Sequence, residues 1–158
     1  MAVGDLSPEV LSWLTENGWS PGRDIGTECD EDIDVRVRDS ERQGTPLQPS
    51  DAAKRIIRTY GLLKLKHPRV SGRILKMEPA AGYEGDAEDI SELASNLGCR
   101  LFPVGYDSEE FGLVLVDERG RFFYLHHTGG YFWGADEDEA FTRFLTGAHA
   151  PDAEDFFV

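Results

Sequence analysis

Apolar residues repeat at helical spacing in four segments of the chain. Ile90, Leu93, Ala94 and Leu97 fall at positions i, i+3, i+4 and i+7, which is the spacing of one helix face. The other three segments carry similar stripes, and each begins near a good capping residue and ends at a glycine. These patterns predict helices over residues 7–17, 51–60, 87–97 and 137–146.

The second half of the chain shows short apolar runs separated by turn residues. These runs predict strands, one over residues 69–77 and the others over residues 101–104, 112–116, 121–126 and 131–133. Pro103 suggests an edge position or an irregular end for its strand. His126 and His127 are adjacent on a predicted strand, so we expect their side chains to point to opposite faces.

Residues 24–48 are open to two interpretations. Ile33, Val35 and Val37 alternate with charged residues, which favours a half-exposed strand. The flanking residues are strongly polar, and a short helix from about Asp30 to Gln43 fits equally well. The segment that follows contains Gly44 and two prolines and is expected to be a loop.

The order of these elements favours an α+β fold with a mainly antiparallel sheet and helices packed around it. A length of 158 residues suits a single domain. No internal repeat or shift in composition marks a second one. We therefore expect one domain over residues 1–158, with its core over about 7–147 and a short acidic and aromatic tail over 148–158.

The charge of the chain narrows the classes of partner. Sixteen Lys and Arg residues against thirty Asp and Glu residues give a formal charge of -14. Such a chain is not expected to bind nucleic acid by neutralising phosphates, nor to bind an anionic membrane through a basic patch. The sequence shows no signal peptide and no membrane-spanning stretch, and two cysteines in no metal or redox spacing suggest a reduced, cytoplasmic protein.

The sequence contains no recognisable catalytic or ligand-binding motif. The four histidines lack metal-binding spacing, Cys29 lies among acids that disfavour a thiolate, and the glycines form no phosphate-binding loop. The alternating acids of residues 30–34 lack the glycine and glutamate that complete a calcium loop, so a solvated acidic face is the simpler interpretation. We expect no catalytic residue, no metal and no cofactor.

Part of the acidity has a structural interpretation. Nine acids lie at the caps or first turns of predicted helices, where they complement the helix dipole. They are Glu9, Asp51, Asp86, Glu88, Asp89, Asp136, Glu137, Asp138 and Glu139. The remaining surplus gathers in residues 28–34 and in the loop at residues 107–110.

Four short stretches resemble the SUKH-3 branch of the SUKH superfamily. Residues 18–23 (GWSPGR), after the helix that begins at Pro8, resemble the opening of that family. Residues 101–105 (LFPVG) and 112–121 (GLVLVDERGR) resemble its central strands, and the last helix with its LTG ending is similar to the family's end. The resemblance covers about residues 7–147. Residues 28–48 are more acidic than the family pattern and lack its Trp and Leu positions, yet the resemblance favours helix over strand for about 30–43.

The resemblance implies a non-enzymatic bacterial immunity protein of a polymorphic toxin system, which binds and neutralises a cognate toxin in the cytoplasm. Family members face different toxins, often nucleases or deaminases, so the toxin is not specified. An acidic surface would steer towards a basic toxin, and exposed aromatic side chains would anchor it. The candidate partner-binding residues are Asp30, Glu31, Asp32, Asp34, Tyr106, Asp107, Glu109, Glu110, Phe111 and Tyr131. The alternative is a general interaction scaffold or regulatory domain with no dedicated toxin, and the oligomeric state is open.

Overall fold

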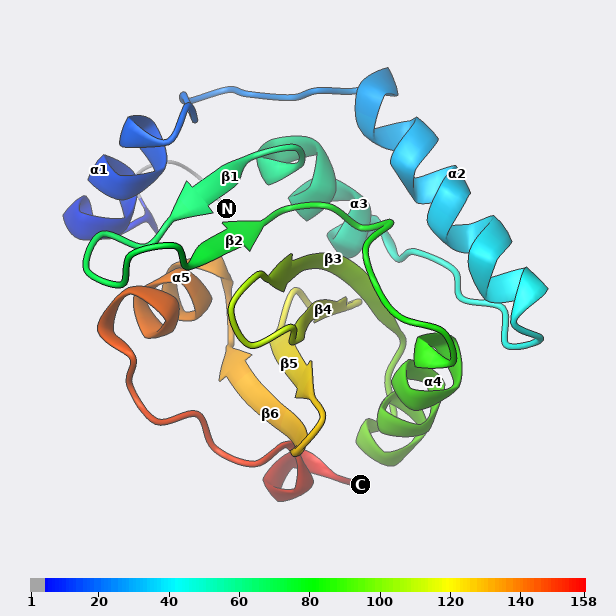
Figure 1. Cartoon of the computed structure of the whole chain (residues 1–158). Coiled ribbons are helices and arrows are strands. Elements are labelled where there is room, and N and C mark those ends of the chain that lie inside the picture. The colour runs from blue at the N-terminus through cyan, green and yellow to red at the C-terminus, as the bar shows by residue number, and fades with distance from the viewer. Residues whose placement is uncertain (1–4) are drawn as a thin grey trace.

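A six-stranded antiparallel sheet forms the centre of the computed structural model, which describes residues 5–158 (Figure 1). The strands pair in chain order, so each one lies beside the strands that precede and follow it. They are β1 (Lys64–Lys66), β2 (Ile74–Lys76), β3 (Leu101–Asp107), β4 (Leu113–Asp117), β5 (Phe122–His126) and β6 (Gly129–Gly134). This arrangement confirms the predicted α+β fold with an antiparallel sheet.

Five α-helices and a short C-terminal 3-10 helix surround the sheet in the described residues. They are α1 (Pro8–Glu16), α2 (Thr27–Arg42), α3 (Asp51–Tyr60), α4 (Asp86–Leu97), α5 (Glu137–Thr146) and η2 (Ala153–Phe156). Ser7, Ser50 and Asp136 cap α1, α3 and α5 with side-chain oxygens that accept a backbone N–H. Within residues 5–158, none of these helices combines the length and the apolar character needed to cross a membrane.

The ambiguous segment is helical, so the helix interpretation of residues 30–43 is confirmed and the strand interpretation is wrong. The buried positions of α2 are Cys29, Ile33, Arg36 and Ser40, at spacings of four, three and four residues. That spacing follows one helix face. Two of the four side chains are polar, which explains why apolar periodicity alone did not reveal the helix.

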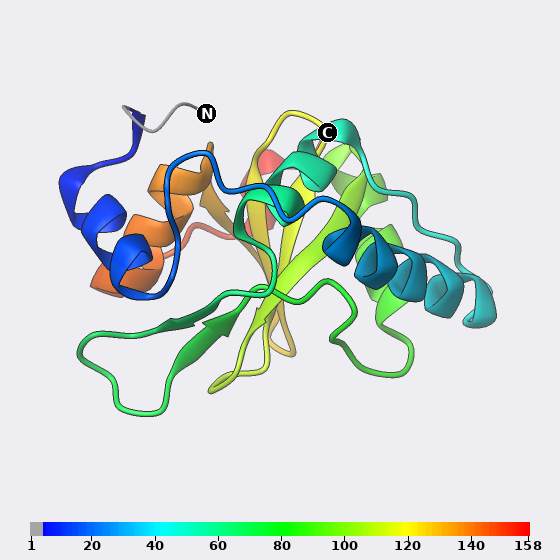
Figure 2. The same cartoon turned by 90° about the horizontal axis from the view of Figure 1, so that it is seen from above.

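The two faces of the sheet are covered to different extents. On β5, Phe122 packs against Phe141 of α5, whereas the next residue, Phe123, packs against Phe156 of η2. The face of Phe122 is called the back face; it also carries α3, which lies behind the sheet in Figure 1 and above it in Figure 2. The opposite, front face is covered by α4 and η2 over only part of its area.

The hairpin of β1 and β2 differs from the sequence prediction. β1 was not predicted, and the strand expected over residues 69–77 is confined to Ile74–Lys76. The connecting loop is held by His67, whose Nδ1 accepts the amides of Arg69 and Val70. Its Nε2 therefore carries the proton and donates to the carbonyl of Phe144, 3.2 Å away. Val70, the apolar residue of this loop that suggested a strand, is instead exposed in the turn.

The structure agrees with the expectation for Pro103 but not with the one for His126 and His127. Pro103 lies in the part of β3 that pairs only with β4, at a register shift, because β2 pairs with β3 only at its far end. An irregular, one-sided position suits a residue without an N–H. The expectation that His126 and His127 point to opposite faces is wrong: β5 ends at His126, and the two ring centroids are 3.9 Å apart.

Among residues 5–158, four acids are fully buried, and each pairs with an arginine. The pairs are Asp86 with Arg36, Asp107 with Arg73, Asp117 with Arg121, and Glu137 with Arg55. Asp86 and Glu137 begin α4 and α5, as predicted, but their carboxylates take part in tertiary ion pairs rather than only complementing a helix dipole. The residue at the N-cap of α4 is Gly85, not Asp86.

Candidate functional site

The uncovered part of the front face forms a groove, here called the front groove. Its floor consists of Tyr106, Leu113 and Leu125, which are cross-strand neighbours on β3, β4 and β5. Two adjoining hollows of about 740 and 580 Å³ share Tyr83 and Phe111 as lining residues. The front groove is therefore continuous from the β2–α4 loop to the end of β5.

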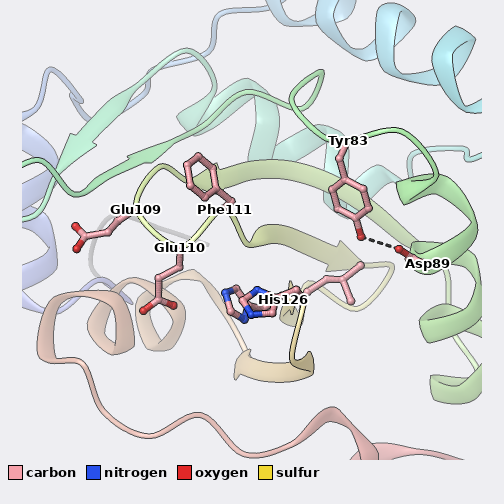
Figure 3. Close-up of a pocket in the computed structure, with 8 residues that line it drawn as sticks. Tyr83, Asp89, Glu109, Glu110, Phe111 and His126 are labelled. Atoms are coloured by element: carbon pink, nitrogen blue, oxygen red, sulfur yellow. Dashed lines mark hydrogen bonds between the residues drawn. The ribbon is translucent and has the colours of Figure 1, made fainter.

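Aromatic and acidic side chains form the walls of the front groove. Figure 3 shows Tyr83 on one side and Phe111 on the other, with Glu110 on the side of Phe111. The hydroxyl of Tyr83 donates to Asp89 of α4 at 2.8 Å. Burial raises the pKa of Tyr83, as do this hydrogen bond and the charge of Asp89, so the hydroxyl stays protonated and continues to donate.

Phe111 is the most exposed aromatic residue among those the structure describes, with 74% of its surface accessible. Its φ is 60°, in the left-handed region, where a side chain other than glycine costs about 1 kcal/mol. The amide of Phe111 donates to the carbonyl of Asp107 at 2.8 Å, which holds the loop in this conformation. A strained backbone therefore presents an apolar ring to solvent.

The loop that carries Phe111 is anchored from below by Asp107. The Asp107 carboxylate accepts hydrogen bonds from Arg73 at 2.7 Å, from Tyr124 at 3.3 Å and from the amide of Glu109 at 3.1 Å. Burial and the charge of Asp107 raise the pKa of Tyr124, which keeps its hydroxyl a donor. Asp107 was expected in the exposed acidic patch, but its side chain is 0% exposed and orders the loop from within.

Glu109 and Glu110 remain as exposed acids of the loop. Neither carboxylate makes a hydrogen bond or an ion pair within 4 Å among residues 5–158. Asp89 adds a third carboxylate from α4, and His126 and His127 lie at the β5 end of the front groove. The groove thus combines apolar surface with unpaired negative charge.

A comparison with protein families agrees with the fold. The family model for the SUKH-3 immunity protein matches residues 6–147. The chain belongs to the SUKH-3 immunity protein family. No curated protein and no solved structure matches it closely enough to be compared.

Membership in the SUKH-3 family implies a binding role rather than a catalytic one.

One group in the described part of the chain could offer three metal ligands, Cys99, Asp117 and Glu118, whose ligand atoms lie within 4.8 Å of one another. Burial raises the pKa of Cys99 to about 11, which disfavours the thiolate. Asp117 already accepts the side chain and the amide of Arg121. This group is therefore poorly suited to hold a metal.

The remaining candidate residues lie away from the front groove. Asp30, Glu31, Asp32 and Asp34, here called the α2 acids, belong to the first half of α2, and Asp30 pairs with Arg58 at 3.2 Å. Tyr131 of β6 does not line the groove; its hydroxyl is 2.7 Å from the Thr128 hydroxyl. The structure brings together four of the ten candidates, Tyr106, Glu109, Glu110 and Phe111.

Sequence reasoning missed the wall opposite Phe111 and part of the floor of this SUKH-3 groove. Tyr83, Asp89 and Leu125 come from the β2–α4 loop, from α4 and from β5. Only the pairing of β3, β4 and β5 brings them near Phe111. The available signal was Tyr83 itself, an aromatic residue in a loop of small residues (PAAGYEG) with no large apolar side chain beside it.

Proposed function

We infer that this SUKH-3 protein neutralises a cognate toxin by binding it, and that the front groove is the contact surface. The observation that carries the proposal is Phe111, held in a strained conformation with most of its ring in solvent. Strained residues gather at binding sites, and aromatic side chains dominate binding energy when a partner buries them. Family membership supplies the class of function, and the groove supplies a surface for it.

The charge supports a basic toxin as the partner. The formal charge of -14 favours fast association with a positively charged surface, and Glu109, Glu110 and Asp89 place three carboxylates around the groove. Toxins that act on nucleic acids need a basic surface for their own substrate. An acidic protein that covers that surface blocks the substrate by both charge and volume.

The test is co-expression with candidate toxins of polymorphic toxin systems, followed by binding measurements with the toxin that the wild-type protein neutralises. Wild-type protein should restore growth, and purified protein should bind the toxin with an affinity that falls as salt is added. The variant Glu109→Lys/Glu110→Lys should lose protection. Glu31→Lys/Asp34→Lys on α2 changes the net charge equally and should keep it.

Three other outcomes would contradict parts of this proposal. Loss of protection only in the α2 variant would move the interface to the α2 acids. Protection by both variants would remove both acidic surfaces from the interface. Failure of wild-type protein to bind or neutralise the toxin, combined with weak binding to several unrelated proteins, would favour a scaffold role instead.

A further inference from the structure

The front groove presents hydrogen-bond acceptors and aromatic faces to one and the same space. Tyr83 and Phe111 line both adjoining hollows from opposite walls, and Tyr106 lies on the floor between them. Glu109, Glu110 and Asp89 supply carboxylates along the larger hollow. A side chain seated there would lie among aromatic side chains and close to carboxylates.

A cation of this chain already uses one of these rings. Lys76 of β2 is the cross-strand neighbour of Tyr106, and its Nζ lies 5.6 Å from the centroid of the Tyr106 ring. That distance is within the range of a cation–π contact. The Tyr106 ring therefore already serves a cation of this chain, which leaves the rings of Tyr83 and Phe111 for a cation of the partner.

The donors and acceptors of the site select between cationic side chains. The one donor of Tyr83 is used by Asp89, while the carboxylates of Glu109 and Glu110 have no partner among the described residues. A guanidinium carries five donors and no acceptor, and its flat face stacks on aromatic rings. An ammonium is a compact, strongly hydrated charge that stacks less well.

We propose that the front groove is a receptor for an arginine side chain on a basic segment of the toxin. The guanidinium lies between the rings of Tyr83 and Phe111 and donates to the carboxylate of Glu110 or Asp89. The combined volume of the hollows also accommodates the neighbouring residues of the segment. This assignment rests on the function proposed above, and it names the chemistry of the partner at that site.

A short peptide tests this chemistry without the toxin. The full-length 15N-labelled protein is titrated with acetyl-Gly-Arg-Gly-Arg-Gly-amide, and the amide shifts of Tyr83, Asp89, Glu110 and Phe111 are followed. We expect saturable changes at these residues with a dissociation constant on the order of 1 mM. The matched control replaces each arginine by citrulline, which keeps the shape and removes the charge, and should cause no saturable change.

A variant of the protein completes the test. Phe111→Leu keeps an apolar side chain and removes the ring, and leucine tolerates the backbone conformation, since Leu62 has a φ of 66° in this chain. It should bind the arginine peptide about two- to fivefold more weakly, the loss expected for one exposed cation–π contact. Equal binding by Phe111→Leu, equal shifts with citrulline, or shifts at the α2 acids instead would overturn the arginine assignment.

The peptide experiment and the toxin experiment can each refute one proposal without refuting the other. If Glu109→Lys/Glu110→Lys abolishes protection while the arginine peptide does not perturb the groove, the interface stands and the arginine receptor is wrong. If the peptide binds as expected but wild-type protein does not neutralise the toxin, the groove chemistry stands and the proposed function is wrong.

Discussion

The ion pair between Arg36 and Asp86 joins α2 to the start of α4. The two side chains are 2% and 0% exposed, and Arg36 Nη2 lies 2.7 Å from Asp86 Oδ2. Asp86 also accepts the amide of Tyr83 and the side-chain amide of Gln43. One buried carboxylate therefore fixes two helices and the loop that carries a wall of the front groove.

Replacing Asp86 by alanine should be strongly destabilising. Removing one partner of a buried ion pair costs about 3–5 kcal/mol, because the other charge remains buried without compensation. Asp39 lies 3.7 Å from Arg36 and is partly exposed, so it replaces some of the lost attraction. We therefore expect the lower end of the range, about 3 kcal/mol, out of the roughly 5–15 kcal/mol that stabilise a typical domain.

Removing both charges should be less harmful than removing one. In Arg36→Met/Asp86→Ala, no buried charge is left unpaired, and methionine fills most of the space of the arginine stem. The double variant should be more stable than Asp86→Ala alone. Glu88→Ala is the matched control: Glu88 is an exposed acid in the same first turn, where its charge contributes about 0.3–1 kcal/mol.

Urea unfolding followed by tryptophan fluorescence measures these differences, since Trp13, Trp19 and Trp133 are all buried. The midpoint should fall in Asp86→Ala with an unchanged slope, which indicates a loss of stability rather than a change in the unfolded chain. A loss below about 1 kcal/mol would refute the reasoning from buried charge. A double variant no more stable than Asp86→Ala would refute it as well.

Three further changes test the loops around the sheet. Phe111→Gly should raise the free energy of unfolding in urea by about 0.5–1 kcal/mol, because glycine adopts a positive φ without strain. The same variant should bind the toxin more weakly. A lower free energy of unfolding would show that the ring supports the fold. Gly112→Ala should cost about 1–3 kcal/mol in the same assay, since its Cβ would lie 2.0 Å from the Tyr124 ring, and a neutral result would contradict that packing. Burial and the charge of Arg73 lower the pKa of His67 below its ordinary value of 6.5, so the folded state favours the neutral imidazole. The unfolded chain therefore takes up a proton at a higher pH than the folded protein does. Stability should fall as the pH drops through 6.5 towards the folded pKa. His67→Gln should lose less stability than wild type between pH 7.5 and pH 5, and an identical pH dependence of the two proteins would refute the assignment.

The helices that the sequence predicted well are those whose ends carry chemical signals. Ser7, Ser50 and Asp136 are the capping residues at the starts of three predicted helices, and each accepts a hydrogen bond from the backbone three residues on. Capping depends on neighbouring residues and is therefore visible in the chain itself. α2 lacks such a signal, since its N-cap is Gly26 and one of its buried positions is Arg36.

The sequence predicted only those residues of the front groove that lie together in one segment of the chain. Exposed aromatic and acidic residues at 106–111 occur together in the sequence, and the structure places four of them on the front groove. Tyr83 and His126 lie on other elements and reach the groove only through strand pairing. No local pattern could have joined them to Phe111, because their proximity is a property of the sheet.

The sequence also does not show which acids are buried. Asp107 and Glu109 are two residues apart in one acidic run. The carboxylate of Asp107 pairs with Arg73, whereas the carboxylate of Glu109 has no hydrogen-bond or ion-pair partner among residues 5–158. The difference follows from the alternation of side chains along a strand. Tyr106 faces the front groove, so the side chain of Asp107 points to the back face, where Arg73 and Tyr124 donate hydrogen bonds to it. On the proposed function, we therefore expect Asp107 to contribute to toxin binding without touching the toxin. It fixes the loop before association, and a loop that is already ordered loses less entropy when a toxin binds.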